Sequence, residues 1–227
     1  MTNRRNFLKT AITAVSGAAL ASSSFATPTK EPSKFDEEFD VVIVGAGGAG
    51  LSAAAHMPKG VKTLLIEKNG LVAGSSLVCD GKYSAAGTPD QAKEGIKDSD
   101  EKFVADLLKV GQGQNNLEVV KALVKALKVE YDWLTEHGIK SKYVGIASGM
   151  SVPRAHNFDP AEVLSLYQKV AKENGVEFRF NNAGHRLLWD DEKNRIGGIS
   201  VNTKDGLKKI KAKYGVILTT GGFARNP

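Results

Sequence analysis

The order of apolar and polar positions divides the chain into strand-like and helix-like segments. Residues 41–44 and 61–66 are short apolar runs with the length and branched side chains of buried parallel strands. A helix from Ala49 to about Met57 joins them. Apolar residues recur at helical spacing in three later segments, residues 100–110, 117–136 and about 160–174. A strand–helix–strand unit followed by amphipathic helices predicts an α/β fold.

Short strands dominate the last third of the sequence. Apolar runs at residues 176–180, 186–189, 196–201, 207–212 and 216–218 are separated by polar turns at residues 190–194 and at Asp205-Gly206. Closely spaced strands of this kind pair with antiparallel neighbours. We therefore predict a Rossmann-like parallel sheet with helices, to which a small antiparallel section returns.

A glycine-rich turn follows the first predicted strand. Gly45, Gly47 and Gly50 fit the G-x-G-x-x-G fingerprint of dinucleotide-binding proteins. The first glycine allows a tight turn, the second lets a pyrophosphate approach the backbone, and the third lets the helix pack close to the sheet. Gly48 and Ala49 open the helix, whose free N–H groups attract phosphate.

A carboxylate stands where the fingerprint requires one. Glu67 ends the second predicted strand, about 20 residues after Gly47, at the usual place of the acid that accepts hydrogen bonds from an adenosine ribose. An acid here argues against a ribose 2′-phosphate, and so against NADP. The fingerprint alone leaves FAD and NAD open.

Two further loops are rich in small residues. One contains Ser75, Ser76 and Gly81, and the other, with Gly221, follows the last predicted strand. Such loops let a backbone approach a planar ligand or bind phosphate, although a solvent-exposed flexible loop has the same composition. A third loop, residues 149–156, holds Arg154 and His156, which we interpret as loop and domain-contact residues.

Composition excludes several classes of protein. The 227 residues carry a formal charge of +6, and no basic run is interleaved with aromatic residues, so no nucleic-acid partner is expected. Cys79 is the only cysteine, so the sequence holds no haem-attachment or iron–sulfur motif. No metal site is predicted.

The first 26 residues have the composition of a targeting segment. Arg4, Arg5 and Lys9 carry half of the formal charge, and the segment has no acidic residue. They are followed by a short apolar stretch and then by small residues before Thr27. The stretch is too short to span a membrane. The pattern predicts a twin-arginine export signal and a periplasmic location, then a polar linker over residues 27–38 and one binding domain over residues 39–227.

The same motifs, taken in order, resemble a known family of flavoproteins. The segments 40–52, 64–68, 74–88, 132–134, 151–156 and 220–226 are similar to the fumarate reductase and succinate dehydrogenase superfamily. The soluble periplasmic flavocytochrome c type is the most similar, with its methacrylate and urocanate reductase relatives. The resemblance implies non-covalently bound FAD, because no histidine occupies the position that holds FAD covalently in the membrane-bound enzymes.

The resemblance also implies which residues contact FAD. They are the glycine-rich turn with Gly48 and Ala49, the strand end Glu67 and Lys68, the loop residues Ser75, Ser76 and Gly81, and Gly221. Three positions depart from the family's pattern. Ser75 replaces the usual asparagine, Asp80 replaces a small residue and Lys82 replaces a glycine. The side chains of Asp80 and Lys82 are expected either to form an exposed pair or to obstruct the flavin edge.

In the family, a capping domain with the catalytic arginine follows the position of Gly221. We therefore expect no catalytic residue in this sequence and an incomplete fold. The implied function is reduction of a conjugated acid such as fumarate, with a second polypeptide that supplies the cap and a cytochrome c or similar electron donor. A non-catalytic FAD module or inactive remnant, and a dehydrogenase of the ketosteroid type, remain alternatives.

Overall fold

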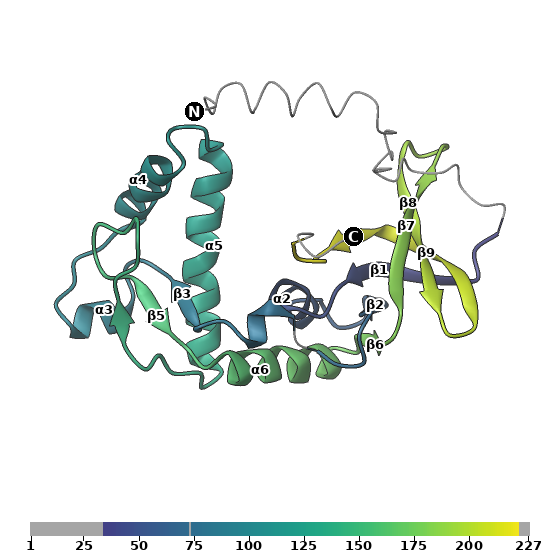
Figure 1. Cartoon of the computed structure of the whole chain (residues 1–227), viewed down its shortest axis with the longest axis horizontal. Helices are drawn as coiled ribbons and strands as arrows, with labels where there is room; N and C mark the ends of the chain where they lie inside the picture. The colour runs from purple at the N-terminus through teal and green to yellow at the C-terminus, as the bar shows by residue number, and fades with distance from the viewer. Residues whose placement is uncertain (1–33, 73, 223–227) are drawn as a thin grey trace, which may run out of the picture.

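The main sheet of the protein has six strands. The computed structural model describes residues 34–72 and 74–222 (Figure 1). The strands are β1 (Glu37–Val44), β2 (Thr63–Ile66), β6 (Glu177–Arg179), β7 (Ala183–Asp190), β8 (Arg195–Thr203) and β9 (Gly206–Leu218), in the spatial order β6-β2-β1-β9-β8-β7. The first four in this order pair in parallel, while β7, β8 and the start of β9 pair antiparallel. The α/β fold with an antiparallel section is confirmed.

Different layers cover the two faces of the parallel strands. Helices α2 (Gly48–Ala55) and α6 (Pro160–Glu173) cover one face, where Ile43 and Leu65 pack against them. The strands β7 and β8 curve over the other face with Val42 and Leu64 beneath them. The core of the domain thus lies on both sides of β1 and fixes the end of this strand, where the glycine-rich turn begins.

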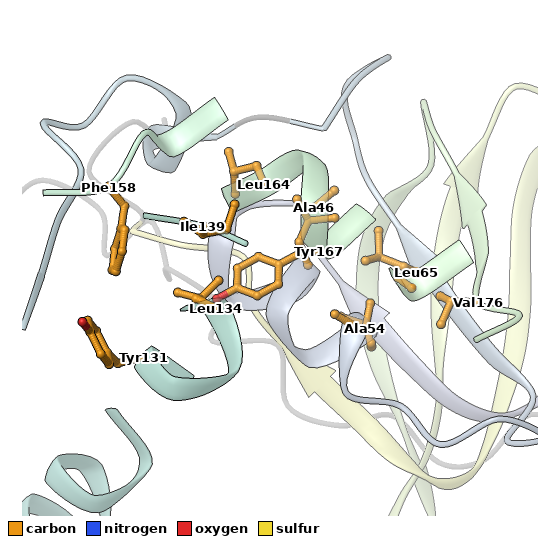
Figure 2. Packing of buried hydrophobic residues seen from close by; sticks show 14 of the residues in the cluster. Ala46, Ala54, Leu65, Tyr131, Leu134, Ile139, Phe158, Leu164, Tyr167 and Val176 are labelled. Atoms are coloured by element: carbon orange, nitrogen blue, oxygen red, sulfur yellow. The ribbon is translucent and has the colours of Figure 1, made fainter. Parts of the chain in front are cut away.

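A smaller lobe stands beside the sheet (Figure 1). It contains the helices α3 (Pro89–Lys93), α4 (Asp100–Val110) and α5 (Leu117–Glu136), and the antiparallel strands β3 (Lys82–Ser84), β4 (Val144–Gly145) and β5 (Ala155–Asn157). The single turn η1 (Ser75–Leu77) lies instead against the start of α2. The lower half of α5 packs against α6 through Leu134 and Tyr167. In Figure 2 the ring of Tyr167 lies among Ala46, Leu134 and Leu164.

Several predicted boundaries are wrong. The strand β1 begins at Glu37, so its first two residues belong to the sheet rather than to the predicted linker. The two predicted strands at residues 207–212 and 216–218 are one strand, β9, which continues its pairing with β1 through a bulge between Ala212 and Gly215. The predicted loop 149–156 ends in β5, which begins at Ala155. The predicted signal segment lies outside the described residues.

Candidate functional site

The glycine-rich turn has the geometry that the fingerprint predicts. Gly45 has φ +109°, and a Cβ atom there would lie 2.6 Å from the carbonyl oxygen of Thr219. A Cβ atom on Gly50 would lie 1.9 Å from the carbonyl oxygen of Gly45, so α2 approaches the turn as closely as a glycine permits. Apart from its chain neighbours, no atom of residues 34–72 and 74–222 lies within 4 Å of the Cβ position of Gly47, so among these residues this side of the turn is open to a ligand.

Glu67 ties the end of β2 to this turn. Its Oε2 accepts a hydrogen bond of 2.8 Å from the backbone N–H of Ala46, and its Oε1 accepts one of 2.8 Å from the N–H of Asn69. The carboxylate is half-buried. Each oxygen has a second lone pair, so the group can also accept hydrogen bonds from ribose hydroxyls. The neighbouring Lys68 is exposed.

The small-residue loop folds over the start of α2. The N–H of Gly48 donates a hydrogen bond of 3.1 Å to Ser76 Oγ, and a Cβ atom on Gly74 would lie 3.4 Å from the Cα atom of Gly47. Gly81 has φ +73°, and a Cβ atom there would lie 2.0 Å from the carbonyl oxygen of Phe158. Segments far apart in the sequence therefore meet at the turn.

A cavity of about 510 Å³ begins at this junction and runs between α2, α5 and α6. This volume is in the range of small-molecule and cofactor sites. The predicted residues in its wall are Gly48, Ala49, Ser76 and Gly81, and the others include the apolar side chains of Leu127, Leu134, Phe158, Val163 and Leu164. Among the lining residues that the structure describes, the charged ones are Lys82 and Glu130.

Not all of the predicted binding residues meet in this cavity. Gly45, Gly47, Gly50 and Glu67 form the adjoining turn, whereas Ser75, Lys68 and Gly221 are exposed outside the cavity wall. The role of all eleven residues in holding a cofactor stays a prediction. The open side of Gly47, next to an apolar cavity, nevertheless fits a dinucleotide whose flat ring enters the space between α2 and α5.

Asp80 and Lys82 form the exposed pair that was one of the two expectations. Their side chains are 2.7 Å apart at the edge of the cavity, and Lys82 lowers the pKa of Asp80 through its hydrogen bond. Lys82 also belongs to the cavity wall, and whether it would obstruct a bound flavin stays a prediction.

Arg154 and His156 are fully buried in the smaller lobe and do not line the cavity. Arg154 pairs with Asp98 and Asp106, which anchors the loop before β5 to α4. The ring of His156 lies 2.8 Å from Thr88 Oγ1, and burial lowers the pKa of this histidine. Both side chains therefore hold the smaller lobe together internally. His156 lies in the strand β5 rather than in a loop, and the expected contact with another domain stays a prediction.

Sequence reasoning missed the polar corner of the cavity. Glu130 Oε1 accepts a hydrogen bond of 2.6 Å from Tyr167, and its Oε2 lies 3.2 Å from His56 Nε2. The sequence motifs gave no binding role to Tyr167, Glu130 or His56. The signal in the sequence was an acid on the otherwise apolar side of α5, at the position between Leu127 and Leu134.

Residues 34–72 and 74–222, which the structure describes, contain neither a metal-binding cluster nor a membrane-spanning helix. In this part of the chain no group of three or more histidine, cysteine or acidic side chains is placed to hold a metal ion. No helix in it combines the length and apolar character needed to cross a bilayer.

Fold and site together define a dinucleotide-binding protein of the α/β class. The chain belongs to the family described as "FAD binding domain", whose profile matches residues 40–227. FAD is therefore the cofactor of this fold, and the family resemblance read from the motifs is confirmed.

Curated relatives of the chain are reductases. It is 39% identical over 195 residues to "Fumarate reductase (cytochrome)" of Shewanella frigidimarina, covering 82% of this chain and 34% of that protein. It is 33% identical over 241 residues to "Acrylate reductase flavoprotein subunit" of Shewanella woodyi, covering 98% of this chain and 47% of that protein. The chain thus spans between a third and a half of the length of these relatives.

Solved structures agree with this assignment. The open conformation of a flavocytochrome c3 fumarate reductase superposes with a TM-score of 0.78 at 28% identity, covering all of this chain and 38% of that one. A 3-ketosteroid-Δ4-(5α)-dehydrogenase from Rhodococcus jostii superposes with a TM-score of 0.76 at 23% identity, covering 88% of this chain and 50% of that one. The second likeness shows a shared fold alone.

Proposed function

We propose that this chain is the FAD-binding part of an exported reductase that acts on a conjugated carboxylic acid. The observation that carries the proposal is the junction of the open Gly47 turn with the apolar cavity, in a chain 39% identical to a fumarate reductase. The substrate class comes from fumarate, acrylate and urocanate, named for relatives of the chain.

Within this proposal, each part of the junction has a task. The backbone N–H groups at the start of α2 bind the pyrophosphate, and Glu67 accepts hydrogen bonds from the adenosine ribose. The apolar walls around Leu127 and Phe158 exclude water from the flat ring. FAD, when bound non-covalently there, supplies hydride transfer to an activated double bond.

The residues that clamp and protonate the substrate belong to a different polypeptide segment in this proposal. Reduction of a double bond needs a positioned proton donor and cationic clamps for carboxylates. In the cavity wall that the structure describes, Lys82 is the cationic side chain, and it is paired with Asp80. We therefore assign catalysis to a partner polypeptide that carries the cap and the catalytic arginine.

Export and electron supply complete the proposal. The Arg4-Arg5 motif supports a twin-arginine signal, and that route carries proteins that have already folded around a cofactor. The cysteine content leaves no haem or cluster motif in this sequence. A separate cytochrome c or similar carrier in the periplasm is therefore the proposed electron donor.

Absorption spectroscopy of the purified chain tests the proposal. We expect FAD in a 1:1 ratio that acid releases, and reduction of fumarate or acrylate by a dye donor once the cap-bearing polypeptide is added. Releasable FAD without activity after this reconstitution would instead identify a non-catalytic FAD module. A folded chain that takes up no FAD would refute the proposal.

A further inference from the structure

The cavity opens to solvent on one side, and a lysine stands at this opening. The exposed residues of the cavity wall are Ala49, Cys79, Lys82 and Leu123. Lys82 is the cationic side chain among the lining residues that the structure describes. The other charged residue of this wall, Glu130, has its two carboxylate oxygens turned toward Tyr167 and His56. Lys82 therefore sets the sign of the charge at the opening.

The backbone on either side of Lys82 is held by the strand β5 and the residue that follows it. Asn157 Nδ2 donates a hydrogen bond of 2.6 Å to the carbonyl oxygen of Asp80, and the N–H of Phe158 donates one of 2.9 Å to the carbonyl oxygen of Gly81. Lys82 itself is the partner of Asn157 in the antiparallel register of β3 and β5. The Cα atom of Lys82 is therefore fixed at the edge of the cavity, although the side chain is 41% exposed.

The two charges of the Asp80–Lys82 ion pair lie at different places relative to the cavity. Lys82 Nζ is 2.7 Å from Asp80 Oδ2, and the Asp80 side chain is 64% exposed. Lys82 belongs to the cavity wall, whereas Asp80 does not. The hydrogen bond with Asp80 raises the pKa of Lys82, so the ammonium group keeps its charge at neutral pH. The pair thus presents its positive end to the cavity and its negative end to solvent.

A charge at this place acts on any cofactor whose own charge distribution changes on reduction. The inference rests on the proposed function, in which FAD occupies the cavity. Reduction adds electrons to the flat ring, and a nearby cation stabilises the electron-rich form more than the oxidised form. We propose that Lys82 raises the reduction potential of the bound cofactor, and that Asp80 limits this effect by offsetting the charge of Lys82.

The size of the effect follows from the exposure of both side chains. Water screens charges at a surface, so one such charge shifts an equilibrium by about two- to fivefold. For a two-electron couple, in which a tenfold change corresponds to about 30 mV, this factor is about 10–20 mV. Added salt should reduce the shift, because the screening length falls from about 30 Å at 0.01 M to about 3 Å at 1 M.

The test measures the midpoint potential of the FAD-loaded chain at low salt, by stepwise reduction beside a dye of known potential. We expect Lys82→Gln to lower the potential by about 10–20 mV, because the charge of Asp80 then acts alone. Asp80→Asn should raise the potential by a similar amount, because the charge of Lys82 is then no longer offset. A structural disturbance without an electrostatic cause has no reason to give shifts of opposite sign.

Two further variants serve as controls. Lys82→Arg keeps the positive charge and should keep the wild-type potential. Lys121→Gln removes the cation of an exposed pair with Glu118 on α5, and because Lys121 does not line the cavity, the potential should stay unchanged. Asp80→Asn changes a side chain outside the wall and carries the test if Lys82→Gln does not retain FAD.

Equal potentials in the wild type, Lys82→Gln and Asp80→Asn overturn the inference. Shifts of the same sign in these two variants also overturn it, and so does a shift that Lys121→Gln reproduces. A wild-type chain that takes up no FAD overturns the proposed function and the inference with it, so the two failures are distinguishable.

Discussion

Replacement of Arg154 by methionine tests how the smaller lobe is held together. Arg154 is fully buried, and its guanidinium donates to Asp98 through Nε at 2.9 Å and Nη2 at 2.8 Å, and to Asp106 through Nη1. It also lies 4.6 Å from the centre of the Phe103 ring. Methionine fills much of the same space but leaves two partly or fully buried carboxylates without their cation.

Breaking a buried ion pair from one side costs about 3–5 kcal/mol, because the remaining charge keeps its desolvation penalty. We therefore expect Arg154→Met to lower the free energy of unfolding by about 3–5 kcal/mol at pH 7. Urea titration followed by circular dichroism measures this value. Arg195→Met, which removes hydrogen bonds to the exposed carbonyls of Lys213 and Tyr214, is the matched control and should cost under about 1.5 kcal/mol.

The pH dependence sharpens this test. Burial raises the pKa of Asp98, but the hydrogen bonds from Arg154 and Gln91 outweigh it, so this pKa lies below its ordinary value of 3.8. In the wild type, Asp98 stabilises the fold above that value, and the contribution is lost as pH falls through the folded pKa. Without Arg154, protonation relieves the buried charge, so the difference between variant and wild type should shrink as pH falls toward 4. A cost at pH 7 below about 1 kcal/mol, or one independent of pH, would refute the reasoning.

Three more predictions concern the turn, the ribose acid and a buried histidine. Gly50→Ala should abolish FAD binding and destabilise the fold, since its Cβ atom would lie 1.9 Å from a carbonyl oxygen, whereas Gly47→Ala should weaken FAD binding at unchanged stability. Flavin titration and thermal unfolding measure both, and equal behaviour of the two variants would contradict the assigned geometry. Glu67→Gln should raise the Kd for FAD by about 10- to 100-fold, as loss of a charged hydrogen bond does, while Glu192→Gln in an exposed turn should not. Burial lowers the pKa of His156, so the free energy of unfolding should decrease as pH falls below about 6.5. This decrease should be smaller in His156→Gln, and an identical pH profile would exclude the histidine as its source.

Strong periodicity made most of the fold predictable. The helices α4 and α5 have the predicted bounds, residues 100–110 and 117–136, because apolar residues repeat on one side through their full length. The helix α3 was missed because it has five residues, although Thr88 and Gln91 form a capping box that the sequence displays. The short strand β4 has two residues and no pattern of its own.

The candidate site was predictable only in part. The spacing of the glycines and the position of Glu67 are fixed by the local backbone of the turn. Both can therefore be recognised directly in the sequence. The cavity depends on where α5 crosses α6, and the periodicity of a helix does not say which of its apolar residues meet a neighbour. The sequence therefore does not reveal that Leu127 and Glu130, both on α5, line the cavity.

The single strand β9 has a consequence for the order of folding. Thr219 directly follows this strand, and its Oγ1 donates to the carbonyl oxygens of Val44 and Gly45 at 2.8 and 3.1 Å. These partners are separated by about 175 residues, so β1 must wait for a distant part of the polypeptide before its second parallel neighbour can form. Closing so long a loop is slow, and high contact order lowers folding rates. The glycine-rich turn therefore leaves the ribosome long before Thr219 and the end of β9 are synthesised. We expect the cofactor site at this turn to be completed late in folding.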